Sequence, residues 1–264
     1  MRKLLLAGAT LICMAFTQTE KYYVTFVKGF VMVQGTGRAV KVGDALKPAD
    51  KLHFKDVEAK LSCISPGKGR FNISAVDSKV KAGGELLAVL KDALVPLASN
   101  HRFSTRSDAL EEYDPKIYFR AAETGDRVLL IKDEPFPVLS SYPADESRHF
   151  FVQYQLADKT VIRKVKQEGN GLLFTDELFK DLQGSASAKI RLCYQTSAGD
   201  NPRHAVLASF IPVLASKAEV QEQIRVIKSM SGSTDPRKVN NEIIAHVYEN
   251  YGKISSEELM KLME

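Results

Sequence analysis

Between residues 22 and 73, apolar and polar side chains alternate in short runs that are separated by turn residues. Leu52 and Phe54 flank His53, for example, and Gly43-Asp44 closes the run before them. Alternation that uses β-branched and aromatic residues is typical of half-buried strands, and glycine beside aspartate favours a turn. Short strands that follow one another through tight turns form a small β barrel or sandwich most easily. The sequence therefore predicts a compact β domain in this part of the chain.

The same stretch resembles a known family. The resemblance is carried by spaced apolar, glycine and charged positions: Val40, Val42, Gly43, Asp44, Leu46, Lys47, Pro48, Asp50 and Leu52, followed by Ala59, Leu61, Pro66, Gly67 and Gly69. This pattern is similar to that of the FecR-type periplasmic β domain and covers roughly the first fifth of the chain. The resemblance implies an envelope-located module that senses or relays signals through protein contacts, not through catalysis.

The first residues predict export from the cytoplasm. Arg2 and Lys3 precede an apolar run from Leu4 to Phe16, and small residues occur near Ala15 to Thr17. These features are typical of a secretory signal peptide over residues 1–17. The apolar run is shorter than the roughly 20 residues that span a bilayer. We therefore expect no transmembrane helix in the mature chain and a periplasmic or secreted location.

Charge and cysteine content narrow the possible partners. The chain carries 37 lysine and arginine residues against 32 acidic residues, a net charge of +5. That excess is too small for the many phosphate contacts of nucleic-acid binding. Without the signal peptide two cysteines remain, Cys63 and Cys193, and an oxidising compartment permits a bridge between them. Their separation in the sequence favours two buried thiols in different domains.

Residues 85–98 predict a helix, because leucines recur at helical spacing at Leu86, Leu87, Leu90, Leu94 and Leu97. One interpretation is a docking helix with an apolar stripe. We favour a helix that folds back to cap the open end of the first β domain, which then spans residues 21–98. The polar and basic residues 99–114 that follow predict a linker.

A second β domain is predicted over residues 115–215. Strand-like runs cover residues 127–131, 137–140, 149–156, 160–166, 171–174, 189–196 and 205–214. About seven strands within roughly a hundred residues are typical of an immunoglobulin-like sandwich. The chain has no tryptophan, and this region has one cysteine instead of two. The prediction therefore concerns the architecture and not membership of the immunoglobulin family.

The last segment, residues 216–264, predicts two or three short amphipathic helices. Asp235 with Pro236, and Ser255 with Glu258, are typical N-terminal helix caps. An apolar stripe runs along these helices: Val239, Ile243, Val247, Tyr251, Leu259 and Leu262. The stripe packs either on the preceding sandwich or on a partner protein. We favour the partner, because the sandwich already looks complete and short helices have little core of their own.

A basic run at residues 159–166 is a second candidate for partner contact. Arg163, Lys164 and Lys166 lie in a predicted strand and would form a patch for an acidic protein surface or an anionic envelope polymer. The alternative is an edge strand in which lysine prevents unwanted strand pairing. We favour the edge strand.

The sequence contains no motif that predicts a catalytic site, a metal site or a cofactor. The five histidines are scattered, none in a metal-ligand spacing, and no phosphate-binding loop or nucleophile elbow is present. We therefore expect a mainly β, exported, non-enzymatic interaction or scaffold module that binds envelope proteins of a signalling or secretion assembly.

Two alternatives remain open from the sequence. The first is a periplasmic protein that binds a glycan or peptide between its two domains, in a pocket lined by Tyr22, Tyr23, Tyr142, Tyr154 or Tyr194. The second is an envelope hydrolase with a pair of carboxylates that only the fold brings together.

Overall fold

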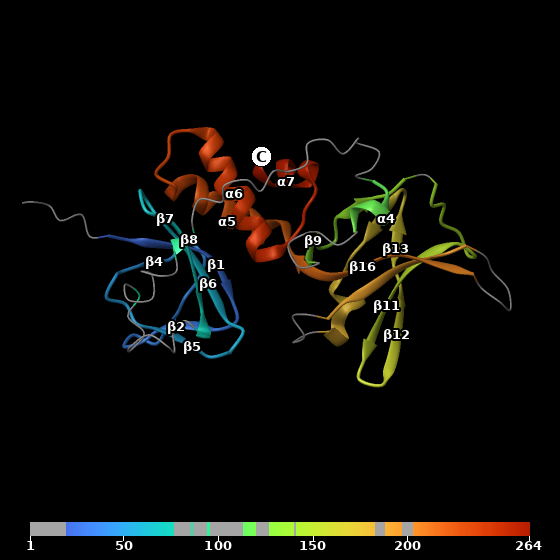
Figure 1. The fold of residues 1–264 in the computed structure, drawn as a ribbon, viewed down its shortest axis with the longest axis horizontal. Coiled ribbons are helices and arrows are strands. Elements are labelled where there is room, and N and C mark those ends of the chain that lie inside the picture. Colours follow the sequence, from blue (N-terminus) through green and yellow to red (C-terminus); the bar gives the residue numbers. More distant parts are fainter. Residues whose placement is uncertain are drawn as a thin grey trace, which may run out of the picture.

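The computed structural model describes residues 20–76, 86, 94–95, 113–119, 127–139, 141–182, 188–196 and 203–264. Within them the protein is mainly β with a helical C-terminus, which confirms the predicted fold class. Figure 1 shows the N-terminal strands in blue and cyan on one side and a second set of strands, green to orange, on the other. The red C-terminal helices lie between the two sets.

The N-terminal domain consists of two antiparallel sheets around one core. Its strands are β1 (Tyr22–Lys28), β2 (Val31–Val33), β3 (Arg38–Ala39), β4 (Ala45–Leu46), β5 (Leu52–Phe54), β6 (Lys60–Ser65), β7 (Gly69–Ser74) and β8 (Leu94–Val95). One sheet has the order β4-β1-β6-β7-β8 and the other the order β3-β2-β5. Side chains at alternate positions, such as Val24, Leu61 and Phe54, fill the shared core. Of the two predicted forms the domain is the sandwich, since the described strands do not close into a barrel.

The stretch predicted as one helix over residues 85–98 contains a strand. Leu94–Val95 is β8, which pairs antiparallel with β7 and places Leu94 opposite Phe71. The helix prediction is wrong for these residues, because pairing with the free edge of β7 outweighs the helical spacing of the leucines. Leu86 is buried in the N-terminal core, and its N–H donates to the carbonyl of Asp50 at 2.9 Å. The remaining residues of this stretch, and residues 99–112 of the predicted linker, lie outside the described residues.

The second domain is an immunoglobulin-like sandwich, as predicted. Its strands are β9 (Arg127–Ile131), β10 (Pro135–Pro137), β11 (His149–Leu156), β12 (Lys159–Lys164), β13 (Lys166–Glu168), β14 (Gly171–Leu173), β15 (Ile190–Gln195) and β16 (His204–Ala215). The sheet orders are β12-β11-β15-β16-β9 and β10-β14-β13. They correspond to strands C′, C, F and G opposite strands B, E and D of an immunoglobulin domain. The first strand, β9, joins the larger sheet by pairing parallel with β16.

Most strand bounds in this domain follow the sequence pattern, with two exceptions. The run predicted at residues 137–140 begins earlier, as β10, because Phe136 is the core residue and proline is tolerated in an edge strand. The basic run predicted as one strand over residues 160–166 is split. Val165 turns into the core and donates its N–H to the carbonyl of Phe150 at 2.9 Å. β12 and β13 on its two sides therefore belong to different sheets.

Two short helices accompany this domain, and three longer ones follow it. The short ones are α4 (Pro115–Tyr118) and the 3₁₀ helix η2 (Asp176–Leu182), and the longer ones are α5 (Lys217–Met230), α6 (Pro236–Tyr251) and α7 (Ser256–Met263). Ser216, Asp235 and Ser255 cap α5, α6 and α7 by accepting backbone N–H groups at 3.2, 2.9 and 3.0 Å. α5 contacts β1 and β6, whereas α6 contacts β9. The helical unit formed by α5, α6 and α7 therefore touches both β domains.

Apolar packing joins this helical unit to the two domains. One cluster contains helix residues such as Ile224 and Ile227 together with Phe26 of β1 and Leu129 of β9. The stripe predicted to face a partner lies in the same cluster: Ile243, Val247, Tyr251, Leu259 and Leu262 are buried, and Val239 packs partly buried beside them. The structure thus corrects the favoured interpretation. The sequence pattern indicates a buried helix face, and the protein's own strands cover that face.

Ile243→Ala is expected to lower the free energy of unfolding by about 2–5 kcal/mol, because it leaves a cavity in the cluster that both domains share. Ile243 is fully buried. Denaturant unfolding followed by circular dichroism measures the effect. The matched control is Met260→Ala in α7, where the side chain is 58% exposed; this change should cost less than about 0.5 kcal/mol. Equal effects of the two substitutions would contradict the core position of Ile243.

Candidate functional site

A buried polar interface holds α6 against the N-terminal sheet. On β7, Phe71 and Ile73 point into the core, so Arg70 and Asn72 point the other way, toward α6. Arg70 is 3% exposed, and its guanidinium donates to Glu249 Oε1 at 2.9 Å. Asn72 Nδ2 donates to Glu249 Oε2, also at 2.9 Å. Both oxygens of one helix carboxylate are thus bound by a single strand, which fixes the position of α6.

Side-chain hydrogen bonds continue from this interface into the helical unit. His246 Nε2 lies 2.9 Å from Gln223 Oε1, and His246 Nδ1 lies 3.2 Å from Asn250 Nδ2. Since an amide oxygen accepts, Nε2 carries the ring proton and Nδ1 accepts from Asn250. Burial, together with the positive charges of Arg70 and Lys60, lowers the pKa of His246 to about 3. The ring therefore stays neutral and links α5 to α6.

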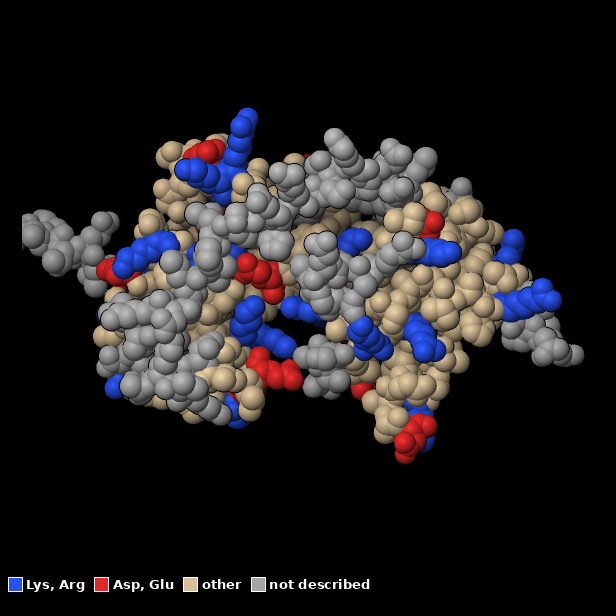
Figure 2. Space-filling view, viewed as in Figure 1, with Lys and Arg blue, Asp and Glu red and all other residues tan. Residues whose placement is uncertain are grey.

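A cleft of about 710 Å³ opens beside this interface, between the two β domains. The end of β1, the start of β6, the start of β9, part of β16 and the helices α5 and α6 form its walls. Its apolar surface comes from Phe26, Val213, Leu214 and neighbouring residues. Figure 2 shows an opening in the middle of the molecule with both basic and acidic side chains around it. The volume is that of a typical ligand site.

Three basic side chains line this cleft: Lys28, Lys60 and Arg127. Lys28 pairs with Glu58 at 3.5 Å, and both side chains are exposed at the rim. The guanidinium of Arg127 donates to carbonyl oxygens at the C-terminal end of α6, where the helix dipole favours a cation. Lys60 forms no ion pair with any residue in the described part of the chain.

Charges of both signs surround Lys60, with three positive neighbours and one negative neighbour acting on its pKa. Burial lowers the pKa of its ammonium group. Glu249 acts in the opposite direction, while the positive charges of Arg127, Arg70 and Lys28 lower the pKa further. Like charges disfavour the charged form of a partly buried group unless an anion is close. An anion in the cleft would therefore relieve the repulsion among these cations.

The cleft differs from the tyrosine-lined pocket predicted as an alternative. The five tyrosines named for that pocket lie elsewhere: Tyr22 in the N-terminal core, Tyr23 partly buried beside the helical unit, Tyr154 and Tyr194 in the core of the immunoglobulin-like domain, and Tyr142 packed against that core. The tyrosine that lines the cleft is Tyr251, whose hydroxyl donates to Glu219 Oε1 at 3.0 Å. Most of the predicted tyrosines therefore stand at inward-facing strand positions and belong to the cores of different domains.

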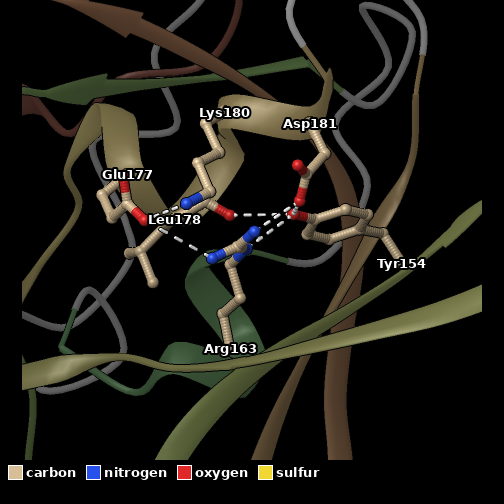
Figure 3. A network of polar contacts seen from close by, with 6 residues as sticks. All are labelled: Tyr154, Arg163, Glu177, Leu178, Lys180 and Asp181. Carbon is tan, nitrogen blue, oxygen red and sulfur yellow. Dashed lines mark hydrogen bonds and ion pairs between the residues drawn. The ribbon is translucent and has the colours of Figure 1, made fainter.

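Arg163 of the predicted basic patch points into its own domain, as Figure 3 shows. Its guanidinium donates to Asp181 Oδ2 at 2.5 Å, and its Nε donates to the hydroxyl of Tyr154 at 3.1 Å. That hydroxyl lies 3.2 Å from the carbonyl oxygen of Leu178. Because Asp181 and Leu178 belong to η2, Arg163 ties this helix to the larger sheet. Its role is to hold the sandwich together.

Lys164 and Lys166 lie on a different face from Arg163. Together with Asp145 and His149 they line a hollow of about 450 Å³. Lys166 pairs with Glu168 at 2.6 Å on the surface. The predicted patch is therefore not one surface, because Arg163 contacts η2 whereas Lys164 and Lys166 line this hollow. β12 is an edge strand of the larger sheet, which is the position that lysine protects from unwanted pairing.

Arg163→Met is expected to lower the melting temperature at pH 7 and to lose that effect in acid. Hydrogen bonding to Arg163 lowers the pKa of Asp181. A carboxyl group whose pKa is lowered by folding stabilises the protein at any pH above its unfolded-state pKa of about 3.9. That stabilisation disappears as the pH falls below this value. The difference in melting temperature between Arg163→Met and the wild type should therefore stay constant from neutral pH to mild acid and become smaller at lower pH. Lys164→Met, which faces the other way, is the control. A difference that persists at the lowest pH would contradict this pairing.

Cys63 and Cys193 are free thiols buried in different domains, which confirms the prediction that they do not bridge. Among the described residues, no group of histidine, cysteine and acidic side chains is placed to hold a metal ion. None of the helices in the described ranges has the length and apolar content that crossing a bilayer requires.

Sequence reasoning did not identify the residues of the cleft and its polar interface. Lys60 and Ser62 alternate with apolar residues, a pattern that indicates a polar strand face but not what covers it. Ser62 is in fact fully buried. His246 is fully buried and hydrogen-bonded to Gln223, which a lone histidine in a predicted helix does not indicate. Arg127 stands at a strand start, where no local signal marks its contact with α6.

No protein-family model matches this chain, and the comparisons with curated proteins and with solved structures found no match either.

Proposed function

We propose that this protein is an exported, non-enzymatic scaffold that contacts other proteins of an envelope-associated signalling or secretion assembly. The signal-like residues 1–17 support the location. The observation that carries the proposal is the apolar cluster in which α5, α6 and α7 pack against β1 and β9 at once. Because this cluster packs against strands of both β domains, their surfaces and the cleft between them would act as one composite binding face.

The test is crosslinking in the cells that make the protein. The full chain carries an affinity tag after Glu264, which is exposed, and is crosslinked mildly before purification and mass spectrometry. An exported tagged domain of similar size is the control. We expect enrichment of one defined envelope protein, and a mature protein that is cleaved near Ala15 to Thr17 and starts at Gln18 or a neighbouring residue. A cytoplasmic protein that keeps Met1, or crosslinks only between copies of itself, would speak against the proposal.

A second candidate is a periplasmic protein that binds a peptide or glycan between its domains, which the position of the cleft favours. A ligand that binds only the folded state raises its melting temperature by mass action. Thermal unfolding in the presence of soluble envelope glycan fragments tests this candidate. A rise in melting temperature that depends on fragment concentration supports glycan binding, and an unchanged melting temperature excludes it.

A further inference from the structure

We propose that the interdomain cleft is an anion-binding site centred on Lys60, and that it receives a carboxylate of an acidic peptide segment in the partner protein. This inference rests on the proposed scaffold function, because it assigns the partner's contact to one place on the composite face. The chemistry of the segment follows from the charges of the cleft, its apolar surface and its size.

The charges of the lining favour an anion at Lys60. Of the two carboxylates that line the cleft, Glu58 is paired with Lys28 and Glu219 accepts the hydrogen bond of Tyr251. Lys60 has no ion pair among the described residues. Arg127 adds a second positive charge to the same cleft. A carboxylate at this point would form a charge-assisted hydrogen bond with Lys60 and would balance the neighbouring cations.

The size and apolar surface favour a peptide segment over a small ion. The cleft has a volume of about 710 Å³, which is far larger than one carboxylate or phosphate group needs. Phe26, Pro212 and Leu214 give it apolar walls close to the basic residues. A segment that alternates acidic and apolar side chains would satisfy both kinds of surface. The chain has no tryptophan, so the cleft lacks the stacking side chain that most favours sugar rings.

The experiment measures binding of a fluorescein-labelled Glu-Leu-Glu-Leu-Glu peptide to the purified protein by fluorescence anisotropy. We expect Lys60→Gln to weaken binding about tenfold or more, because it removes a charged donor. Lys60→Arg keeps the charge and should stay within about threefold of the wild type. Lys164→Gln, on the surface of the immunoglobulin-like domain, is the matched control and should have no effect. Added salt should weaken binding.

Each outcome decides the inference. Equal binding by wild type and Lys60→Gln, or no binding of the peptide at all, would overturn it. A similar loss in Lys60→Arg and Lys60→Gln would also overturn it, since the charge would then not be the recognised feature. A Gln-Leu-Gln-Leu-Gln peptide that binds as well as the acidic one, or inorganic phosphate that displaces the acidic peptide at equal concentration, would exclude an acidic peptide as the ligand.

Peptide binding and crosslinking in cells test the cleft assignment and the scaffold proposal separately. If the peptide binds through Lys60 but crosslinking in cells recovers no envelope protein, the cleft assignment stands and the envelope role fails. If crosslinking recovers a partner whose yield is the same with Lys60→Gln, the scaffold role stands and the cleft assignment fails.

Discussion

Gly252→Ala is expected to destabilise the protein by roughly 3 kcal/mol or more, because it combines backbone strain with a steric clash. Gly252 ends α6 with φ of 103° and ψ of −154°, a region that residues with a side chain hardly populate. A Cβ at this position would lie 2.4 Å from the carbonyl oxygen of Arg127. Strand β9, which contains Arg127, cannot move aside easily, because the N–H of Lys253 donates to the same carbonyl oxygen at 2.9 Å. Thermal unfolding should show a melting temperature lower by roughly 6–12 °C.

Gly35→Ala is the matched control for this prediction. Gly35 also has a positive φ, 86°, but nothing lies within 4 Å of a Cβ built there. The control therefore isolates the backbone strain, which costs about 1–2 kcal/mol for an L-residue. If Gly252→Ala were no more destabilising than Gly35→Ala, the close approach of α6 and β9 would not be as described.

Glu249→Ala is expected to destabilise the protein by about 3 kcal/mol, because it leaves the buried guanidinium of Arg70 without its anion. The side chain of Arg70 is 3% exposed and that of Glu249 22% exposed. An exposed pair offers the contrast: Glu222 and Arg225 on α5 are 47% and 70% exposed. Glu222→Ala should cost less than about 1 kcal/mol. Denaturant unfolding of both variants measures the difference.

The double variant Arg70→Met with Glu249→Leu separates the effect of an unpaired charge from the loss of the pair itself. Removal of both charges leaves no ion buried alone, so the double variant should be more stable than Glu249→Ala. A double variant that is less stable than the single one would show that the pair itself, with Asn72, supplies the stability of the interface.

Much of the immunoglobulin-like domain could be predicted from the sequence. β9 and β11 match the runs at residues 127–131 and 149–156, because strict alternation on a half-buried sheet leaves a clear pattern. The helix caps at Asp235 and Ser255 could also be predicted, because the capping oxygen bonds to backbone only two or three residues away. These signals are local, and the structure retained them.

The parts that could not be predicted depend on contacts between distant segments. The pattern of Ile243 and Val247 indicates a buried face, but the same pattern suits a partner protein and the chain's own strands. Arg163 was placed correctly in a strand, yet only the fold shows that η2 supplies its carboxylate. The charges around Lys60 likewise come from four other elements, β1, β7, β9 and α6. The FecR-type resemblance of the N-terminal domain stays a prediction.

The pairing of Lys253 with β9 has a consequence for the order of folding. Lys253 exchanges backbone hydrogen bonds with Arg127 and Leu129, and Leu262 shares a cluster with Phe26 near the other end of the chain. Contacts this distant in sequence form slowly, because a long loop must close first. A chain that is synthesised from its N-terminus can fold each sandwich as soon as its strands are complete. The contacts between the two sandwiches can form only when the C-terminal residues are present. A C-terminally truncated chain would therefore contain two folded sandwiches that are not packed together.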